Sequence, residues 1–194
     1  MRDTLRMIPA METRKKIFAI SGSTRHGSSN EQILRTLSAQ YSDQLDFHIF
    51  NALSLLPHFN PDLDKDPVPT PVLEFRELVN NADGVIICTP EYIFALPGAL
   101  KNAIEWTVST TVLLDKPLAF IVASGLGEKT FESLTVIMQT VGAIIGPNSR
   151  LLIQGARAKL RPDGSFNDEG IQRSVDQLMK SFMGTMAVKS VSNT

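Results

Sequence analysis

A short polar stretch near the start of the chain holds the residue types best suited to binding chemistry. After the apolar run 17–20, Gly22 is followed by Arg25, by Asn30 and by four hydroxyl side chains, those of Ser23, Thr24, Ser28 and Ser29. A loop between a strand and a helix directs backbone N–H groups and the positive helix end at one point. An arginine adds a planar, permanently charged donor fork. The pattern favours a site for a terminal phosphate. The alternative is an ordinary polar turn in which a serine caps the helix.

Composition and charge limit the function classes. The chain has 194 residues, 43% of them hydrophobic, and its 19 basic and 20 acidic residues leave a net charge of -1. This length and composition favour one globular domain, which we expect over residues 16–194. Residues 1–15 are expected to be a poorly ordered extension. The balanced charge gives no indication of nucleic-acid or membrane binding. A single cysteine, Cys88, and apolar runs too short for a membrane helix predict a cytoplasmic protein.

The rest of the chain alternates between strand and helix patterns. Strands are expected at 16–21, 46–50, 83–88 and 116–123, with short apolar pieces at 143–145 and 150–154. Helices are expected at 28–40, 72–81, 99–108, 129–140 and 168–184. The alternation predicts a parallel sheet with helices on both faces, which binds ligands at the carboxyl ends of its strands. Three loops there, 22–30, 89–98 and 124–128, are expected to form one pocket. Five prolines between residues 57 and 71 predict a long stiff loop, either functional or a surface excursion.

Several familiar signatures do not fit. The loop after Gly22 lacks the second glycine of the dinucleotide fingerprint, and residues 125–130 lack its third. Glu128 separates Gly127 from Lys129, which breaks the P-loop pattern. The three histidines are dispersed, so no metal site is expected. Cys88 ends an apolar run and is interpreted as a packing residue rather than a nucleophile. A phosphate site without a catalytic constellation suits a cofactor that brings its own reactivity.

Two segments resemble a known family. Residues 22–30, with the sequence GSTRHGSSN, resemble the G-S-x-R-x-x-S-x-N phosphate loop of the NADPH-dependent FMN reductase family. Residues 90–106 resemble its P-E-Y-N-x-S-x-P-G-x-L-K-N-A-I-D-W segment. Both motifs keep the family's order, and the element alternation matches from Lys16 to about Phe182. The resemblance implies a flavodoxin-like three-layer sandwich with a five-stranded parallel sheet. It also implies bound FMN, NADPH or NADH as hydride donor, and a homodimer or homotetramer.

The resemblance assigns roles by position. The phosphate of FMN would be held by Ser23, Arg25, Ser28, Ser29 and Asn30. The isoalloxazine ring would be lined by Pro90, Glu91, Tyr92 and Ile93, and approached from the third loop by Ser124 and Gly125. Lys101, Asn102 and Trp106 would lie on a helix near the subunit interface. Ile93 and Ala95 depart from the family's usual Asn and Ser, and each removes a polar group near the flavin.

The implied function is an NAD(P)H-dependent oxidoreductase. Hydride would pass from nicotinamide to flavin N5, and electrons would then pass to a flavin, quinone or similar small acceptor by a ping-pong mechanism. No protein acid or base is required, and none is assigned. Glu91 has two interpretations, an active-site carboxylate or a solvated or helix-capping side chain. The alternatives are an FMN-binding electron carrier, which the neutral charge disfavours, and a non-catalytic flavin-binding regulator.

Overall fold

The computed structural model describes residues 14–192, with side chains up to residue 189. Its strands are β1 (Lys15–Ser21), β2 (Leu45–Phe50), β3 (Gly84–Thr89), β4 (Pro117–Ser124) and β5 (Ile144–Gln154). Its α-helices are α1 (Ser29–Gln40), α2 (Thr70–Asn81), α3 (Gly98–Glu105), α4 (Glu128–Thr140) and α5 (Glu169–Ser192). Short 3-10 turns lie at η1 (Leu53–Leu55), η2 (Pro61–Leu63) and η3 (Ala156–Lys159). Most of the predicted extension, residues 1–13, lies outside the described residues. No helix among the described residues is long and apolar enough to cross a membrane.

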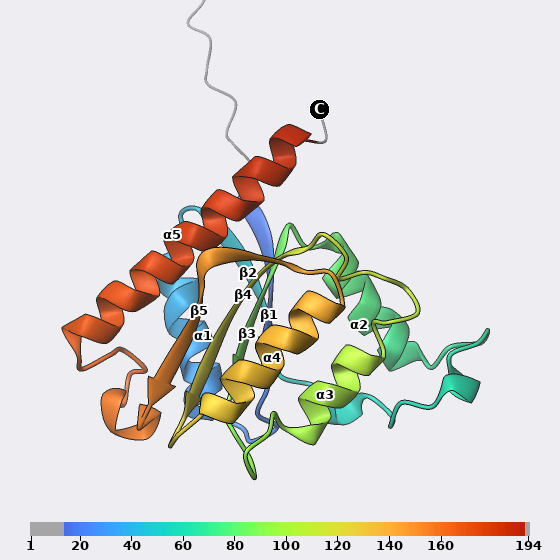
Figure 1. The fold of residues 1–194 in the computed structure, drawn as a ribbon, viewed down its shortest axis with the longest axis horizontal. Helices are drawn as coiled ribbons and strands as arrows, with labels where there is room; N and C mark the ends of the chain where they lie inside the picture. Colours follow the sequence, from blue (N-terminus) through green and yellow to red (C-terminus); the bar gives the residue numbers. More distant parts are fainter. Residues whose placement is uncertain (1–13, 193–194) are drawn as a thin grey trace, which may run out of the picture.

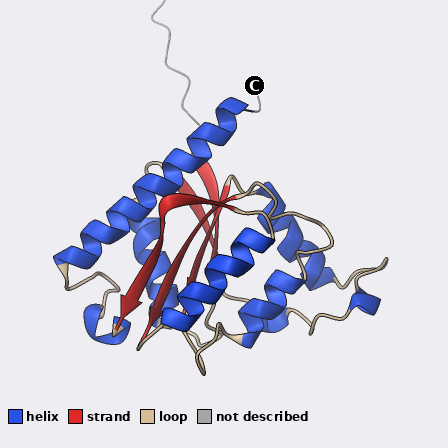
Figure 2. Ribbon diagram, in the orientation of Figure 1, coloured by secondary structure: helices blue, strands red, loops and turns tan. Residues whose placement is uncertain are grey.

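The five strands form one parallel sheet in the order β2-β1-β3-β4-β5. All the strand arrows point toward the lower edge in Figure 2, so the carboxyl ends of the strands gather there. Strand β2 lies on one side of β1, whereas β3, β4 and β5 follow one another on its other side. The predicted flavodoxin-like arrangement, a five-stranded parallel sheet with helices on both faces, is confirmed.

Alternate side chains of each strand face opposite sides of the sheet, because successive Cβ atoms of a strand point to opposite faces. Phe18 and Ile20 pack with apolar residues of α2, α3 and α4. Ile17 and Ala19 pack with those of α1 and α5. Figure 1 shows α1 and α5 on one side of the sheet and the other three helices on the opposite side. Strands covered on both faces explain the near-continuous apolar runs in the sequence.

Two elements are longer than predicted. The apolar pieces at 143–145 and 150–154 belong to a single strand, β5, whose pairing with β4 shifts register between Leu118 and Phe120. Pro147 lies inside β5, which is possible because β5 is an edge strand and does not need every N–H for the ladder. Helix α5 continues to Ser192 rather than ending near residue 184.

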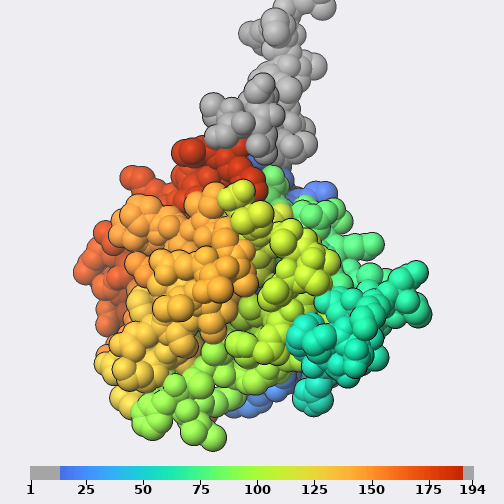
Figure 3. All heavy atoms as spheres, turned by 45° about the vertical axis from the view of Figure 1, so that its right-hand side comes forward, coloured from blue at the N-terminus to red at the C-terminus, as the bar shows by residue number. Residues whose placement is uncertain are grey.

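The proline-rich loop between β2 and α2 is held down by side chains of α2 and α3. Asn102 accepts a hydrogen bond from the Phe59 N–H at 2.7 Å and donates to the Pro57 carbonyl at 3.0 Å. The indole N–H of Trp106 donates to the same carbonyl at 2.8 Å. Arg76 forms an ion pair of 2.7 Å with Asp64 of the loop. In Figure 3 this segment, coloured teal, projects from the body of the protein.

Candidate functional site

The three predicted loops meet at the carboxyl edge of the sheet and enclose one cavity of about 570 Å³. Most of the residues assigned from the sequence are among its lining residues: Ser23, Arg25, Ser28, Ser29, Asn30, Pro90, Tyr92, Ser124 and Gly125. Ala123 and a fourth segment, residues 155–158, complete the lining. This volume lies within the usual range of small-molecule sites, roughly 300–1,000 Å³. The loops that sequence analysis grouped together are therefore brought to one place.

The first loop begins with a glycine that nothing larger can replace without a shift. A Cβ added to Gly22 would lie 2.3 Å from the Thr89 hydroxyl oxygen, at the end of β3. The Gly22 N–H donates to the Cys88 carbonyl at 2.8 Å. This close contact turns the chain directly over the end of the sheet. It places the following hydroxyl residues at the mouth of the cavity.

The loop then enters α1 through a helix cap. The Ser28 hydroxyl accepts a hydrogen bond of 3.2 Å from the Glu31 N–H, which makes Ser28 the N-cap residue. The side chain of Glu31 returns to accept from the Gly27 N–H at 3.1 Å. Reciprocal bonds of this kind resemble a capping box. The first N–H groups of a helix have no backbone partner within it. At α1 Ser28 satisfies the N–H of Glu31, and the residues at the start of the helix, Ser28, Ser29 and Asn30, line the cavity.

Glu31 is a buried carboxylate beneath this loop, and sequence analysis missed it. It is 2% exposed and forms an ion pair of 2.6 Å with Arg35. Burial opposes its ionisation, but hydrogen bonds from Arg35, the Gly27 N–H and Asn51 outweigh burial and lower the pKa of Glu31. The S-x-x-E spacing from Ser28 is the sequence signal that would have indicated it. Glu31 therefore fixes the shape of the loop without entering the cavity.

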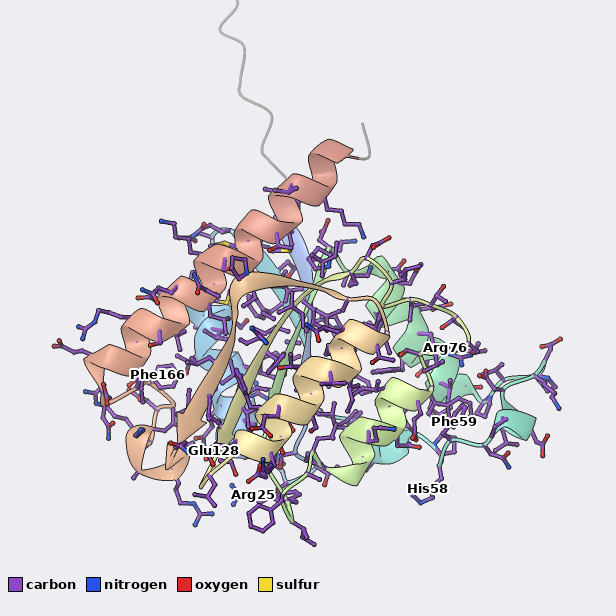
Figure 4. The ribbon with its side chains drawn as sticks, in the orientation of Figure 1. Arg25, His58, Phe59, Arg76, Glu128 and Phe166 are labelled. Carbon is purple, nitrogen blue, oxygen red and sulfur yellow. The ribbon has the colours of Figure 1, made fainter. Side chains whose placement is uncertain are left out.

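The cap contacts of Ser28 and Glu31 do not involve the side chains of Arg25 and Asn30, two predicted phosphate ligands. Among the described residues, the Arg25 guanidinium has no hydrogen bond or ion pair, and it lies at the carboxyl edge of the sheet in Figure 4. Asn30 is 4% exposed, and its side-chain oxygen accepts from the Cys88 thiol at 3.3 Å. That contact holds the amide in place. Burial raises the pKa of the Cys88 thiol, which agrees with its predicted packing role.

The second loop contributes its backbone and Tyr92 rather than its carboxylate. Glu91 accepts hydrogen bonds from the N–H groups of Gly127, at 3.0 Å, and Thr130, at 2.9 Å. Its carboxylate therefore caps α4. Burial opposes ionisation of Glu91, but these backbone donors outweigh it and lower its pKa. Of the two interpretations of Glu91, the structure supports the helix cap. The Glu91 N–H donates to the Ser124 hydroxyl at 3.2 Å, which joins the second and third loops.

Ile93 lies at the tip of a tight turn. Tyr92 and Ala95 exchange backbone hydrogen bonds of 2.9 and 3.1 Å, and the two residues between them have φ values of 52° and 56°. Such conformations favour glycine or asparagine, so a β-branched residue there is strained. The Ile93 side chain is 96% exposed and is not among the cavity-lining residues. Its assignment to the cofactor stays a prediction.

The helix after this loop, α3, has a buried face that contacts the proline-rich loop. Trp106 is fully buried, Asn102 is 8% exposed, and both hold the proline-rich loop. Lys101 pairs with Glu105 on the surface of α3 at 2.6 Å. The structure therefore gives Asn102 and Trp106 a role inside the subunit, and the expected position of this helix near a subunit interface stays a prediction.

The chemistry available to the cavity is anion binding beside an apolar surface. No aspartate or glutamate is among its lining residues, whereas Arg25 and Arg157 are. Pro90, Ala123 and Ala156 supply apolar lining. Among the described residues no group of three or more His, Cys, Asp or Glu side chains could hold a metal ion. A molecule with a phosphate and a flat ring system suits this arrangement.

Comparison with known proteins agrees with the geometry. The signature of the NADPH-dependent FMN reductase family matches residues 15–157. The chain is 31% identical over 171 residues to the NADH:(hydroxy)cinnamate reductase subunit CrdA of Vibrio ruber, covering 85% of this chain and 84% of that protein. It is 34% identical over 110 residues to a quinone reductase of Escherichia coli, which covers 56% of this chain and 57% of that protein.

A solved structure shares the fold over most of the chain. It is FerB, a flavoenzyme NAD(P)H:(acceptor) oxidoreductase from Paracoccus denitrificans, with a TM-score of 0.79 and 27% identity. The match covers 89% of this chain and 97% of FerB. The family signature spans well over half of the chain and includes both motifs quoted from the sequence. The chain belongs to the NADPH-dependent FMN reductase family.

Proposed function

We propose that this protein is an NAD(P)H-dependent FMN oxidoreductase that passes electrons to a flavin, quinone or similar small acceptor by a ping-pong mechanism. The observation that carries the proposal is the cavity at the carboxyl edge. It joins an unpaired arginine, several hydroxyls and a helix N-terminus to an apolar wall. When bound there, FMN would supply the redox chemistry, accepting a hydride from the nicotinamide and returning the electrons to the second substrate.

The residues present fit FMN. One end of the cavity has Ser23, Ser28, Ser29 and the free Arg25, which match a terminal phosphate. Asn30 is held against Cys88, so its amide is fixed at the same end. Pro90, Tyr92, Ser124 and Gly125 line the part formed by the second and third loops and would adjoin the ring system. The absence of an acidic group from the lining avoids repulsion of the phosphate.

The protein's own task would be positioning. Ser28 and Glu31 hold the phosphate loop in one shape, and Glu91 joins the second loop to α4. A fixed cofactor and a shared binding face bring the reacting atoms close, which is a large part of the rate enhancement available to such an enzyme. Because both substrates would use the same face, the first product leaves before the second substrate enters. The cytoplasm, where NAD(P)H is available, would be the site of this reaction.

Initial rates test the mechanism. NADPH oxidation would be followed at several fixed concentrations of a quinone, and then of free flavin. Parallel double-reciprocal lines are expected for a ping-pong mechanism. Intersecting lines would contradict that mechanism but leave an oxidoreductase. Failure of every acceptor to sustain NADPH oxidation by FMN-loaded protein would favour the carrier or the regulator.

We also propose that the protein is a homodimer or homotetramer. Apolar side chains gather beside the cavity on exposed loops: Tyr92 is 53% exposed, Ile93 96%, Phe94 68% and Leu126 56%. A second copy that covered them would remove apolar surface from water. Sedimentation equilibrium is expected to give the mass of two or four chains, and a smaller mass for an Ile93→Asn, Phe94→Gly variant. A monomeric wild type would contradict this proposal.

A further inference from the structure

We propose that Arg157 is a second phosphate-binding residue of the cavity, which acts beside Arg25. This inference rests on the proposed function, because it assigns a ligand group within the same cavity. Arg157 lies in the short turn that follows β5, a segment that sequence analysis did not connect with the site. Its ligand would be a phosphate, supplied either by FMN or by the dinucleotide that donates the hydride.

The partners of the arginines distinguish this residue from the others. Six described arginines donate a hydrogen bond or form an ion pair within the protein: Arg14, Arg35, Arg76, Arg150, Arg161 and Arg173. Among the described residues, only the guanidinium groups of Arg25 and Arg157 have neither. Both line the same cavity. The two described arginines without a partner inside the protein are therefore the two that line the cavity. This coincidence indicates that their guanidinium groups bind an anionic ligand.

The backbone that carries Arg157 is held firmly on both sides. The Gly155 N–H donates to the Gly125 carbonyl at 3.1 Å, which joins this turn to the third loop of the cavity. Gly155 has a φ of 60°, a left-handed conformation that favours glycine. Ala156 is 3% exposed and packs into the core, and Asn167 donates to the Ala158 carbonyl at 2.8 Å. A fixed turn with a free guanidinium resembles the first loop, where Glu31 fixes the backbone and Arg25 stays free.

The cavity needs a second cationic group for charge reasons. No acidic residue lines it, so nothing within the lining neutralises Arg157. A flavin with an NAD(P)H donor brings more than one phosphate to the site, and Arg25 accounts for only one of them. Strands β3 and β4 lie between β1 and β5, so the strand ends that lead to the two arginines are about 14 Å apart. That separation leaves Arg157 able to serve either source of phosphate.

The test compares Arg157→Ala, Arg157→Lys and a matched control, Lys159→Ala. The control removes a positive charge two residues away, from a side chain that does not line the cavity. Dissociation constants for FMN and for riboflavin, which lacks the phosphate, would be measured by fluorescence titration of the apoprotein. KM and kcat would be measured for NADPH and NADH with FMN-loaded protein.

Two results support the inference and identify the source. If Arg157→Ala weakens FMN binding by about 10-fold or more and leaves riboflavin binding unchanged, the ligand is the FMN phosphate. If FMN binding is unchanged and KM for the dinucleotide rises by about 10-fold at constant kcat, the ligand is a dinucleotide phosphate. A rise for NADPH alone would indicate its 2′-phosphate. In either case Arg157→Lys is expected to retain part of the wild-type affinity, because lysine keeps the positive charge but lacks the planar donor fork.

Other results overturn the inference. It is wrong if FMN affinity and both KM values stay within twofold of wild type in Arg157→Ala. It is also wrong if Lys159→Ala has the same effect, because the cause would then be the general field of the turn. A wild-type protein that binds no flavin would instead overturn the proposed function. The wild-type titration therefore separates the two failures before any variant is compared.

Discussion

Two loops follow the neighbouring strands β1 and β2, and an arginine acts differently at each of them. The proline-rich loop after β2 is held by Arg76, whose guanidinium donates to Asp64, Ser109 and the Trp106 carbonyl. The loop after β1 carries Arg25, which has no side-chain partner among the described residues. Figure 4 shows Arg76 and Phe59 close together at one side of the molecule and Arg25 at the carboxyl edge. A cation with three partners inside the protein stabilises the fold. A cation at a cavity without such partners is available to bind a ligand.

The hydrogen bonds within each loop distinguish a structural loop from a binding loop. Both loops are rich in residues that break regular structure, so their composition alone does not separate them. In the proline-rich loop the polar groups of Pro57 and Phe59 are satisfied by Asn102 and Trp106. In the first loop the internal bonds come from Ser28 and Glu31, and they leave the donors at the cavity free. Satisfied groups indicate a structural loop, and free groups indicate a binding loop.

The largest expected effect comes from the structural loop. Arg76→Ala would leave Asp64 as a buried, unpaired charge, since both side chains of the pair are 8% exposed. We expect a loss of about 3–5 kcal/mol in the free energy of unfolding, measured by urea denaturation of the apoprotein. The exposed Arg173–Glu169 pair gives the control, and Arg173→Ala is expected to change stability little. If the two variants lose the same free energy of unfolding, the buried pair contributes no more to stability than the exposed pair, which would contradict this prediction.

The next effect concerns the binding loop. Arg25→Ala is expected to weaken FMN binding by about 1.5–3 kcal/mol, the range for a hydrogen bond to a charged group. Stability of the apoprotein should hardly change, because Arg25 has no side-chain partner to lose. Calorimetric titration with FMN and riboflavin checks this, and only FMN should be affected. Unchanged FMN affinity would remove Arg25 from the phosphate site and weaken the contrast with Arg76.

The pH dependence of stability sharpens the same contrast, because Glu31 links loop shape to charge. Its pKa is lower in the folded protein than its ordinary value of 4.5. Its contribution is therefore complete above that value and is lost as the pH falls through the folded pKa. We expect wild type to lose stability below pH 4.5 more steeply than Glu31→Gln, and the variant to be about 1.5 kcal/mol less stable at neutral pH. Parallel stability curves for the two proteins would refute this role.

The smallest expected effect concerns Ser28, which caps α1, and Ser29, which lines the cavity without capping the helix. Ser28→Ala removes the N-cap of α1 and is expected to cost about 1 kcal/mol of stability. It also removes a hydroxyl from the cavity. Ser29→Ala is the matched variant, because Ser29 lines the cavity but does not cap the helix. Thermal denaturation should show a lower Tm only for Ser28→Ala, while both variants bind FMN more weakly. A Tm loss of the same size in Ser29→Ala would contradict the assigned cap.

The sequence patterns predicted the sheet and the meeting of three loops because apolar runs and loop composition are local signals. After Asp83, residues 84–88 of the predicted strand form an unbroken apolar run, as a central parallel strand requires. The full extent of β5 could not be predicted, because Pro147 interrupts the pattern and only its edge position permits it. The sequence also did not show which way the Glu91 side chain points. The same local sequence is compatible with a carboxylate in the cavity and with one that caps α4. Only the tertiary contact with Gly127 and Thr130 distinguishes the two.

The place of Arg157 could not be predicted for a related reason. It follows an edge strand in a turn without a recognisable motif, and it reaches the cavity only because the turn returns to Gly125. Glu31, by contrast, lies three residues after Ser28, and a capping-box search would have found it. Buried Asn102 and Trp106 were recognised as a motif, but their contact with a loop some 45 residues earlier is not a local property.

The central claim is that the cavity holds a flavin that NAD(P)H reduces. The most direct measurement is the absorption spectrum of the purified protein, reconstituted with FMN if necessary, before and after NADPH is added without air. We expect flavin bands that bleach within the turnover time and return when an acceptor is added. A protein that takes up no FMN, or one whose flavin bands resist both NADPH and NADH, would contradict the account.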